Sequence, residues 1–206
     1  MFYTFTYMNK DQLAKEHLKQ FLSGFPNLDN SMISQLAEII QVIAPTKGTI
    51  LMQEGTVPDA CYFVLKGLVR QYQIIDGTER TTEFYTESHG TVSSMHYTER
   101  TPSSFYLECM EDCLLIIGDR ETDPVHFEKF PALVEITKQM LENDLNKIKE
   151  NYSQFILSSP LERYEHFLKT RPDVHIRVPL HQIASYLGMT PESLSRIRKR
   201  RVSPGK

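Results

Sequence analysis

Residues 180–200 constrain the possible fold of this 206-residue chain more than any other stretch. Two short helical patterns flank Gly188, a residue type that adopts the positive φ of a tight turn without steric cost. Ala184 supplies the small side chain needed where two helices cross closely. The apolar positions of both patterns would face one core: Ile183, Leu187, Met189, Leu194 and Ile197. The stretch therefore predicts a helix-turn-helix.

The second of these helices has the features of a DNA-reading helix. Thr190 can cap its N-terminus, and Pro191 occupies the first turn, where its missing N–H is not needed. Arg196 has the donors for guanine, and Glu192 can accept from the amino group of cytosine. We expect DNA contacts from Thr190, Glu192, Ser193, Ser195, Arg196, Lys199 and Arg200. The alternative is an ordinary helical hairpin with a basic face.

The charge distribution favours a polyanion-binding module at this end of the chain. Residues 161–206 contain ten basic and four acidic residues, a net charge of +6, whereas the whole chain carries −3. The remaining residues are therefore strongly acidic, at −9. A basic segment on an acidic body is typical of a nucleic-acid-binding module joined to a domain with another role. A merely solvated basic end is the alternative.

Upstream, the sequence changes from a helical to a strand-like pattern. Apolar residues recur at helical spacing over residues 11–43. Residues 44–118 instead hold short apolar runs separated by glycine turns about ten residues apart, which predicts antiparallel strands in a sandwich or barrel. Asp76-Gly77, between two alternating runs, predicts a hairpin. The expected fold class is therefore α+β.

A long helix is predicted after the strands. From residue 134, apolar residues alternate in steps of four and three, as in a two-stranded coiled-coil seam. The expected dimer seam comprises Val134, Leu141, Leu145, Ile148, Tyr152 and Phe155, with Lys138 as its single polar interruption. A helix packed on its own domain is the alternative. Residues 158–160 (Ser-Ser-Pro) indicate a hinge, a short helix is expected from residue 161 to about 169, and residues 175–178 indicate one short strand.

The remaining composition excludes several classes of protein. We find no apolar run long enough to span a membrane and no secretion signal, so the cytoplasm is the expected compartment. Three cysteines, an odd number, argue against a disulfide framework. Cys109 and Cys113 lack a second ligand pair for a metal, so structural thiols are favoured over metal binding or redox sensing. No histidine pairs with a nucleophile and no phosphate-binding loop is present, so we expect neither catalytic residues nor an enzyme.

The order of strand-rich domain, seam helix and helix-turn-helix resembles the Crp/Fnr family of bacterial regulators over roughly residues 25–200. Residues 51–67 have the glycine spacing of that family's cyclic-nucleotide-binding β-roll. Residues 182–198 are similar to its DNA-reading motif, particularly in the version found in Bacteroidetes.

The resemblance implies three parts. They are an N-terminal double-stranded β-helix (jelly roll) sensor domain with helices at residues 1–130, a dimerisation helix at 131–158 and a winged-helix-like helix-turn-helix domain at 159–206. It also implies a homodimer that binds double-stranded DNA. RNA polymerase and a small-molecule effector are candidate partners, and a membrane is not.

The sequence departs from the family at the effector site. Cyclic AMP binders carry Gly-Glu and then Arg-Ser or Arg-Thr, where this chain has Gly90-Thr91 and Pro102-Ser103. Arg100 lies two residues early, and burying an unneutralised phosphate is costly. The candidate effector residues are Gly90, Thr91, Arg100, Pro102 and Ser103, but the usual mode of cyclic AMP binding is disfavoured. The effector stays unidentified. His89 and His96 flank this loop as alternative ligand or metal contacts.

Other departures concern cofactors and the DNA-binding end. The N-terminal cysteine cluster of the iron–sulfur members is missing, so no such cluster is expected. The wing after the recognition helix is expected to be missing or very short. Pro191 stands where some relatives place a base-reading arginine, so a DNA sequence preference cannot be transferred. The competing function is a small-molecule sensor that signals through protein contact, with a vestigial helix-turn-helix.

Overall fold

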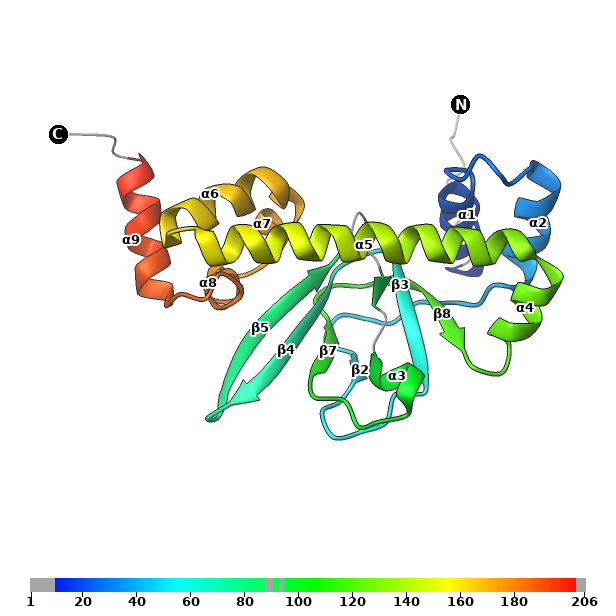
Figure 1. The fold of residues 1–206 in the computed structure, drawn as a ribbon, viewed down its shortest axis with the longest axis horizontal. Helices are drawn as coiled ribbons and strands as arrows, with labels where there is room; N and C mark the ends of the chain where they lie inside the picture. The colour runs from blue at the N-terminus through cyan, green and yellow to red at the C-terminus, as the bar shows by residue number, and fades with distance from the viewer. Residues whose placement is uncertain (1–9, 88–90, 93–94, 203–206) are drawn as a thin grey trace, which may run out of the picture.

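The computed structural model describes residues 10–87, 91–92 and 95–202, which form an α+β structure. A 27-residue helix, α5 (Pro131–Leu157), runs along most of the molecule. N-terminal helices lie against one end of α5, a strand-rich body lies below its middle, and a helical unit lies at its other end (Figure 1).

The N-terminal helices are α1 (Lys10–Leu22) and α2 (Asn30–Ile39). Asp29 caps α2 by accepting a hydrogen bond of 2.8 Å from the backbone N–H of Met32. Apolar faces of both helices pack with the start of α5 and the outer face of a sheet. The predicted helical region extended too far, because residues 42–43 form strand β1 (Val42–Ile43).

Two four-stranded antiparallel sheets form the body. One has the order β1-β8-β3-β6, and the other has the order β2-β7-β4-β5. The remaining strands are β2 (Ile50–Met52), β3 (Ala60–Lys66), β4 (Val69–Ile75), β5 (Thr78–Tyr85), β6 (Thr91–Val92), β7 (Tyr106–Cys109) and β8 (Leu114–Asp119). The short helix α3 (Met95–Glu99) follows β6. This arrangement confirms the predicted antiparallel strands and, of the two expected forms, is a sandwich.

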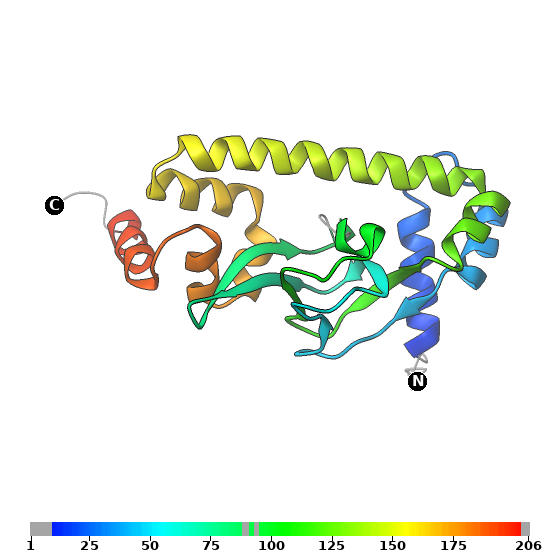
Figure 2. The ribbon, with the colours of Figure 1, turned by 60° about the horizontal axis from the view of Figure 1, so that its bottom comes forward.

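The hairpin of β4 and β5 projects from the body toward the helical unit (Figure 2). Asp76 and Gly77 both have positive φ, 51° and 72°, which matches the two-residue turn expected from the sequence. The strands pair from Val69 opposite Tyr85 to Ile75 opposite Thr78, with one register shift between Gln71 and Tyr72. The hairpin is thus a continuous arm that connects the body to the helical unit.

Helix α4 (Asp123–Lys129) leads into α5. Only Leu133 and Ile136, near its start, are buried along α5. In the part of the chain that the structure describes, no helix is long and apolar enough to cross a membrane. Ser158 ends α5 in an extended conformation, and Ser159 and Glu162 form a capping box for the next helix. The predicted break at residues 158–160 is confirmed.

The C-terminal unit contains α6 (Pro160–Thr170), α7 (Pro172–Arg177), α8 (Leu180–Tyr186) and α9 (Pro191–Val202). The strand expected at residues 175–178 is wrong, because most of this stretch belongs to α7. Val174 is buried in the unit's core, so tertiary packing overrides the β-branched pattern. Residues 158–202 include no wing strand, and residues 203–206 lie outside the described part.

A single core joins the helical unit to the body. Leu68 and Phe84 from the body pack with buried side chains of the unit, which are Tyr164, Phe167, Val174, Val178, Ile183, Ala184, Leu187 and Leu194. The ring of Phe84 is fully buried and lies 5.3 Å from that of Tyr186, centroid to centroid. The helical unit is therefore docked on the hairpin through apolar packing.

Truncating Phe84 should cost much of the stability of this shared core. We expect Phe84→Ala to lower the free energy of unfolding by about 3–5 kcal/mol, measured by urea denaturation. Ile75→Ala, at a half-exposed position of the same hairpin, is the matched control and should change it by less than about 0.5 kcal/mol. Equal stability of the two variants would contradict this packing.

Candidate nucleic-acid interface

Helices α8 and α9 form the predicted helix-turn-helix. Ala184 and Ile183 are fully buried where α8 packs on its neighbours, and Leu194 secures α9 to the same core. Gly188 takes a φ of +67° in the turn. A Cβ at this position would lie 3.0 Å from the ring of Phe155, so the turn needs glycine for both its conformation and its space.

The start of α9 is capped as expected. The hydroxyl of Thr190 accepts a hydrogen bond of 3.2 Å from the backbone N–H of Ser193. A hydrogen bond from its own backbone N–H lowers the pKa of Glu192. Glu192 is therefore a carboxylate at neutral pH and can accept hydrogen bonds from a donor outside the protein.

The outer face of α9 carries the predicted DNA-contacting groups. This face is lined by Thr190 and Ser193 and by five exposed residues of α9, which are Glu192, Ser195, Arg196, Lys199 and Arg200. Arg201 extends the exposed basic surface into the last turn. Helix α9 lies at the end of the molecule, away from the sheets (Figure 1). Its polar face is therefore unobstructed by the rest of the described chain.

Arg163 fastens the end of α5 to this motif. Its guanidinium donates to the carbonyls of Leu187 (3.0 Å) and Ser158 (3.2 Å) and lies 4.2 Å from the centroid of the Phe155 ring. The bond to Leu187 satisfies a carbonyl at the C-terminus of α8. The hinge and the turn of the helix-turn-helix are thus held by one cation.

Polar contacts position the unit on the hairpin arm. The backbone N–H of Thr81, in β5, donates to the hydroxyl of Ser185, in α8, at 2.9 Å. Arg171 is only 4% exposed and donates to the Phe84 carbonyl at 2.6 Å and to Glu83 at 3.4 Å. Burial raises the pKa of Glu83, while Arg171 opposes that shift. Sequence reasoning missed these contacts, because they join residues that lie far apart along the chain.

Arg177 makes a further connection between the unit and the body. Its guanidinium donates to Glu87 at 3.0 Å and also pairs with Glu111, in the turn after β7. Glu87 in turn accepts from the backbone N–H of Gly67 at 2.7 Å. One arginine of the helical unit therefore bridges two separate loops of the body.

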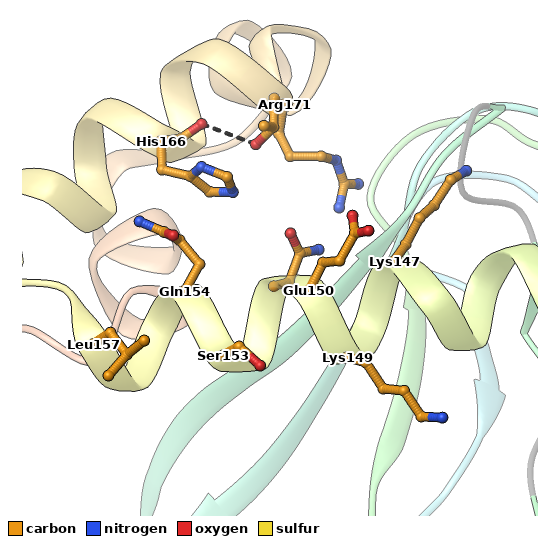
Figure 3. A pocket seen from close by; sticks show the side chains of 10 residues that line it. Lys147, Lys149, Glu150, Ser153, Gln154, Leu157, His166 and Arg171 are labelled. Carbon is orange, nitrogen blue, oxygen red and sulfur yellow. Dashed lines mark hydrogen bonds between the residues drawn. The ribbon is translucent and has the colours of Figure 1, made fainter.

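The back of the hinge is less tightly packed. A cleft of about 580 Å³ lies between α5 and α6, with side chains of Glu150, Gln154, His166 and Arg171 gathered along it (Figure 3). Arg171 Nε and His166 Nε2 have no hydrogen-bond partner there among the described residues. The polar ends of these two side chains therefore face an open space between α5 and α6.

The predicted seam residues differ in their surroundings. Val134, Leu141, Leu145, Ile148 and Tyr152 are between 43% and 66% exposed. Phe155 is also exposed in part, but its ring contacts Arg163 and the Gly188 turn within the chain. An apolar stripe on α5, interrupted by Lys138, is therefore left largely uncovered by the described part of the chain.

The candidate effector residues are only partly described. Gly90 lies outside the described residues, and so does the side chain of Thr91. Arg100 is exposed with a φ of +55°, and Pro102 is also exposed. Ser103 is buried, and its hydroxyl donates to the carbonyl of Phe105 at 2.8 Å.

His89 and His96 were the alternative ligand or metal contacts of this loop. His89 and the side chain of His96 lie outside the described part of the chain. Among the residues that the structure describes, no cluster of three or more metal-ligating side chains occurs.

The body is similar in sequence to a known domain family. Residues 45–122 match the cyclic nucleotide-binding domain family, which covers β2 to β8. No curated protein matched the sequence significantly. The strand-rich body is therefore similar in sequence to this domain family.

Solved structures match the chain over most of its length. FixK2 from Bradyrhizobium japonicum shares 16% identity, with a TM-score of 0.65 over 82% of this chain and 90% of that one. CLP of Xanthomonas campestris, described as a c-di-GMP-responsive global regulator, shares 18%, with a TM-score of 0.65 over 84% and 92%. A Crp/Fnr family transcriptional regulator from Thermus thermophilus shares 16%, with a TM-score of 0.62 over 79% and 86%.

The Arg177 contact predicts a pH dependence. Burial raises the pKa of Glu87, but hydrogen bonds from Arg177 and Gly67 outweigh it and place the pKa below 4.5. A carboxyl group whose pKa is lower in the native than in the unfolded state stabilises the fold at pH values above its unfolded pKa. This stabilisation is lost as the pH falls through the native pKa. The difference in unfolding free energy between wild type and Glu87→Gln should therefore shrink below about pH 4.5. Urea titrations across this range test it.

Glu16→Gln, on the exposed surface of α1, controls for the general loss of a carboxylate. If the wild type and Glu87→Gln differed equally at all pH values, Glu87 would not form a charged contact with Arg177.

Proposed function

We propose that this chain, which has the fold of the Crp/Fnr-type regulators, is a homodimeric DNA-binding transcription regulator. The observation that carries the proposal is the exposed, basic outer face of α9 on a fully formed helix-turn-helix. Under this proposal, residues 159–206 bind duplex DNA, residues 131–158 dimerise, and residues 1–130 form the sensor.

The chemistry of α9 suits insertion into a major groove. Arg196 and Glu192 lie one helical turn apart near the N-terminal end, where base edges are reached. Thr190, Ser193 and Ser195 add short hydroxyls there, and Lys199 and Arg200 further along suit phosphates. The net charge of +6 in residues 161–206 supports the same assignment.

The apolar stripe of α5 supports a homodimer. A parallel pairing of two α5 helices through Leu141, Leu145 and Ile148 would cover side chains that are now exposed. Such a dimer would present two copies of α9 to half-sites related by the dimer axis. RNA polymerase would be a further partner of such a regulator.

A small effector in the β-roll would regulate the dimer by favouring one arrangement of the DNA-binding units. The match of residues 45–122 to a cyclic nucleotide-binding domain supports such a site. Thr91 and Pro102 in place of the charged contacts argue against the usual mode of cyclic AMP binding. If no effector binds the β-roll, the regulator would instead be controlled by its own abundance.

Loss of the Arg196 guanidinium should weaken DNA binding selectively. We expect Arg196→Ala to reduce affinity for a duplex selected from random sequences by about 1–3 kcal/mol, measured by fluorescence anisotropy. The matched control is Lys169→Ala, which removes an exposed cation of α6 outside the DNA-contacting face. If the wild-type chain selected no duplex at moderate salt, the chain would instead be a sensor that signals through protein contact.

A charge in the α5 stripe should separate the protomers. Leu145→Glu would place a carboxylate in the apolar seam, and we expect sedimentation to show a monomer where the wild type is a dimer. Asn143→Glu is the matched control, since it lies exposed on the opposite side of the same helix turn. A monomeric wild type would exclude the proposed dimer.

A further inference from the structure

A cavity of about 300 Å³ lies outside the two sheets, near the start of α5. It is walled by α1 and the end of α2, by β3 and β8 of one sheet, and by α4 and α5. The three short helices gather around this end of α5 (Figure 1). The described effector candidates Arg100, Pro102 and Ser103 do not line it, so it is separate from the candidate effector site of the β-roll.

Most of the cavity wall is apolar. Six half-buried side chains from these elements form much of it: Phe21, Ile40, Phe63, Ile116, Phe127 and Met140. Protein interiors normally fill such a space with side chains, because an unfilled space forfeits dispersion contacts. An apolar cavity of about 150 Å³ holds a molecule of benzene, and ligand sites begin at about 300 Å³. The cavity therefore has the size and the wall for a small apolar molecule.

Gly118 hollows the floor of this cavity. It lies opposite Cys61 where β3 pairs with β8. A Cβ built on Gly118 would lie 2.8 Å from Cys61 Sγ and 2.9 Å from Asp123 Oδ2. The thiol and the carboxylate thus converge over bare backbone. The glycine lets the Asp123 carboxylate of α4 reach across the face of the sheet into the cavity.

The charges around the cavity favour a cation. Burial and the charge of Asp119 raise the pKa of Asp123, and they outweigh a backbone hydrogen bond from Asp119 and the attraction of His126. Burial, with the charge of Asp123, raises the pKa of Cys61 to about 11, so this thiol is neutral near pH 7. Within the described part of the chain, Asp123 forms no ion pair with a lysine or arginine. A half-buried carboxylate in these surroundings is stabilised by an added positive charge.

We propose that the cavity binds a small amphipathic cation, whose apolar body packs against the aromatic and aliphatic wall and whose protonated amine pairs with Asp123. Binding does not depend on DNA. Leu141 lines the cavity and also belongs to the apolar stripe of α5, so an occupant would contact the proposed dimer helix. Only that consequence rests on the function proposed above.

Calorimetric titration of the full chain with octylamine at pH 7 tests the site. Octan-1-ol has the same alkyl chain without the charge, and octanoate carries the opposite charge. We expect one octylamine to bind per chain, octan-1-ol to bind about tenfold more weakly, and octanoate to bind more weakly still. Equal affinity for the three molecules, or no saturable binding of octylamine, would overturn the proposal.

Asp123→Asn separates the charge of the site from its shape. The variant keeps the size of the side chain, so the affinity for octylamine should fall about tenfold while that for octan-1-ol stays unchanged. Glu128→Gln, on the exposed surface of the same helix, is the matched control and should alter neither affinity. An equal loss for both molecules, or no loss for octylamine, would show that Asp123 does not pair with the amine.

Thr137→Phe tests where the molecules bind. Thr137 is half-buried and lines the cavity from α5, so a phenylalanine ring there would fill the space and weaken both octylamine and octan-1-ol at least about tenfold. Gln139→Phe, exposed on the same helix and outside the cavity wall, is the matched control. Unchanged binding by folded Thr137→Phe would place the molecules elsewhere and overturn the proposal. If this variant does not fold, the Asp123→Asn comparison decides, and both results stand whether or not the chain binds DNA.

Discussion

The arrangement of the molecule depends on the docking of the helical unit against the β4–β5 hairpin. Phe84 inserts its ring into the core of that unit, and Arg171 enters the same interface from the opposite direction to bond the Phe84 carbonyl. Burial of Phe84 supplies much of the apolar driving force, while the buried guanidinium fixes the register because its loss of hydration must be offset by specific acceptors. The position of α9 follows from this contact, because Leu194 of α9 packs in the same core as Phe84.

Such an interface is well suited to regulation. Most polar contacts across the interface end on the hairpin or on loops close to the hairpin; they come from Ser185, Arg171 and Arg177. A modest movement of the body therefore changes several of these contacts together. A ligand or a covalent change in the body can therefore act on α9 without touching it, provided that it favours one of two arrangements.

The sequence predicted the parts of this structure that rest on local rules. Gly188, Ala184 and the Thr190 cap specify the helix-turn-helix within about twenty residues, and Asp76-Gly77 specifies the hairpin turn. The stretch at residues 175–178 was misassigned because its β-branched pattern is short and the core around Val174 decides its conformation. The contacts of Glu83 with Arg171, and of Glu111 with Arg177, depend on residues that meet only in the folded chain. No spacing rule reveals them.

In the proposed function, α9 reads a duplex while the rest of the chain positions it. Hydrogen exchange of the full chain with and without a selected duplex tests this most directly. We expect slower exchange over residues 190–201 and unchanged exchange on the outer faces of the sheets. Protection that fell on the sheets or on α5, with α9 unaffected, would contradict it.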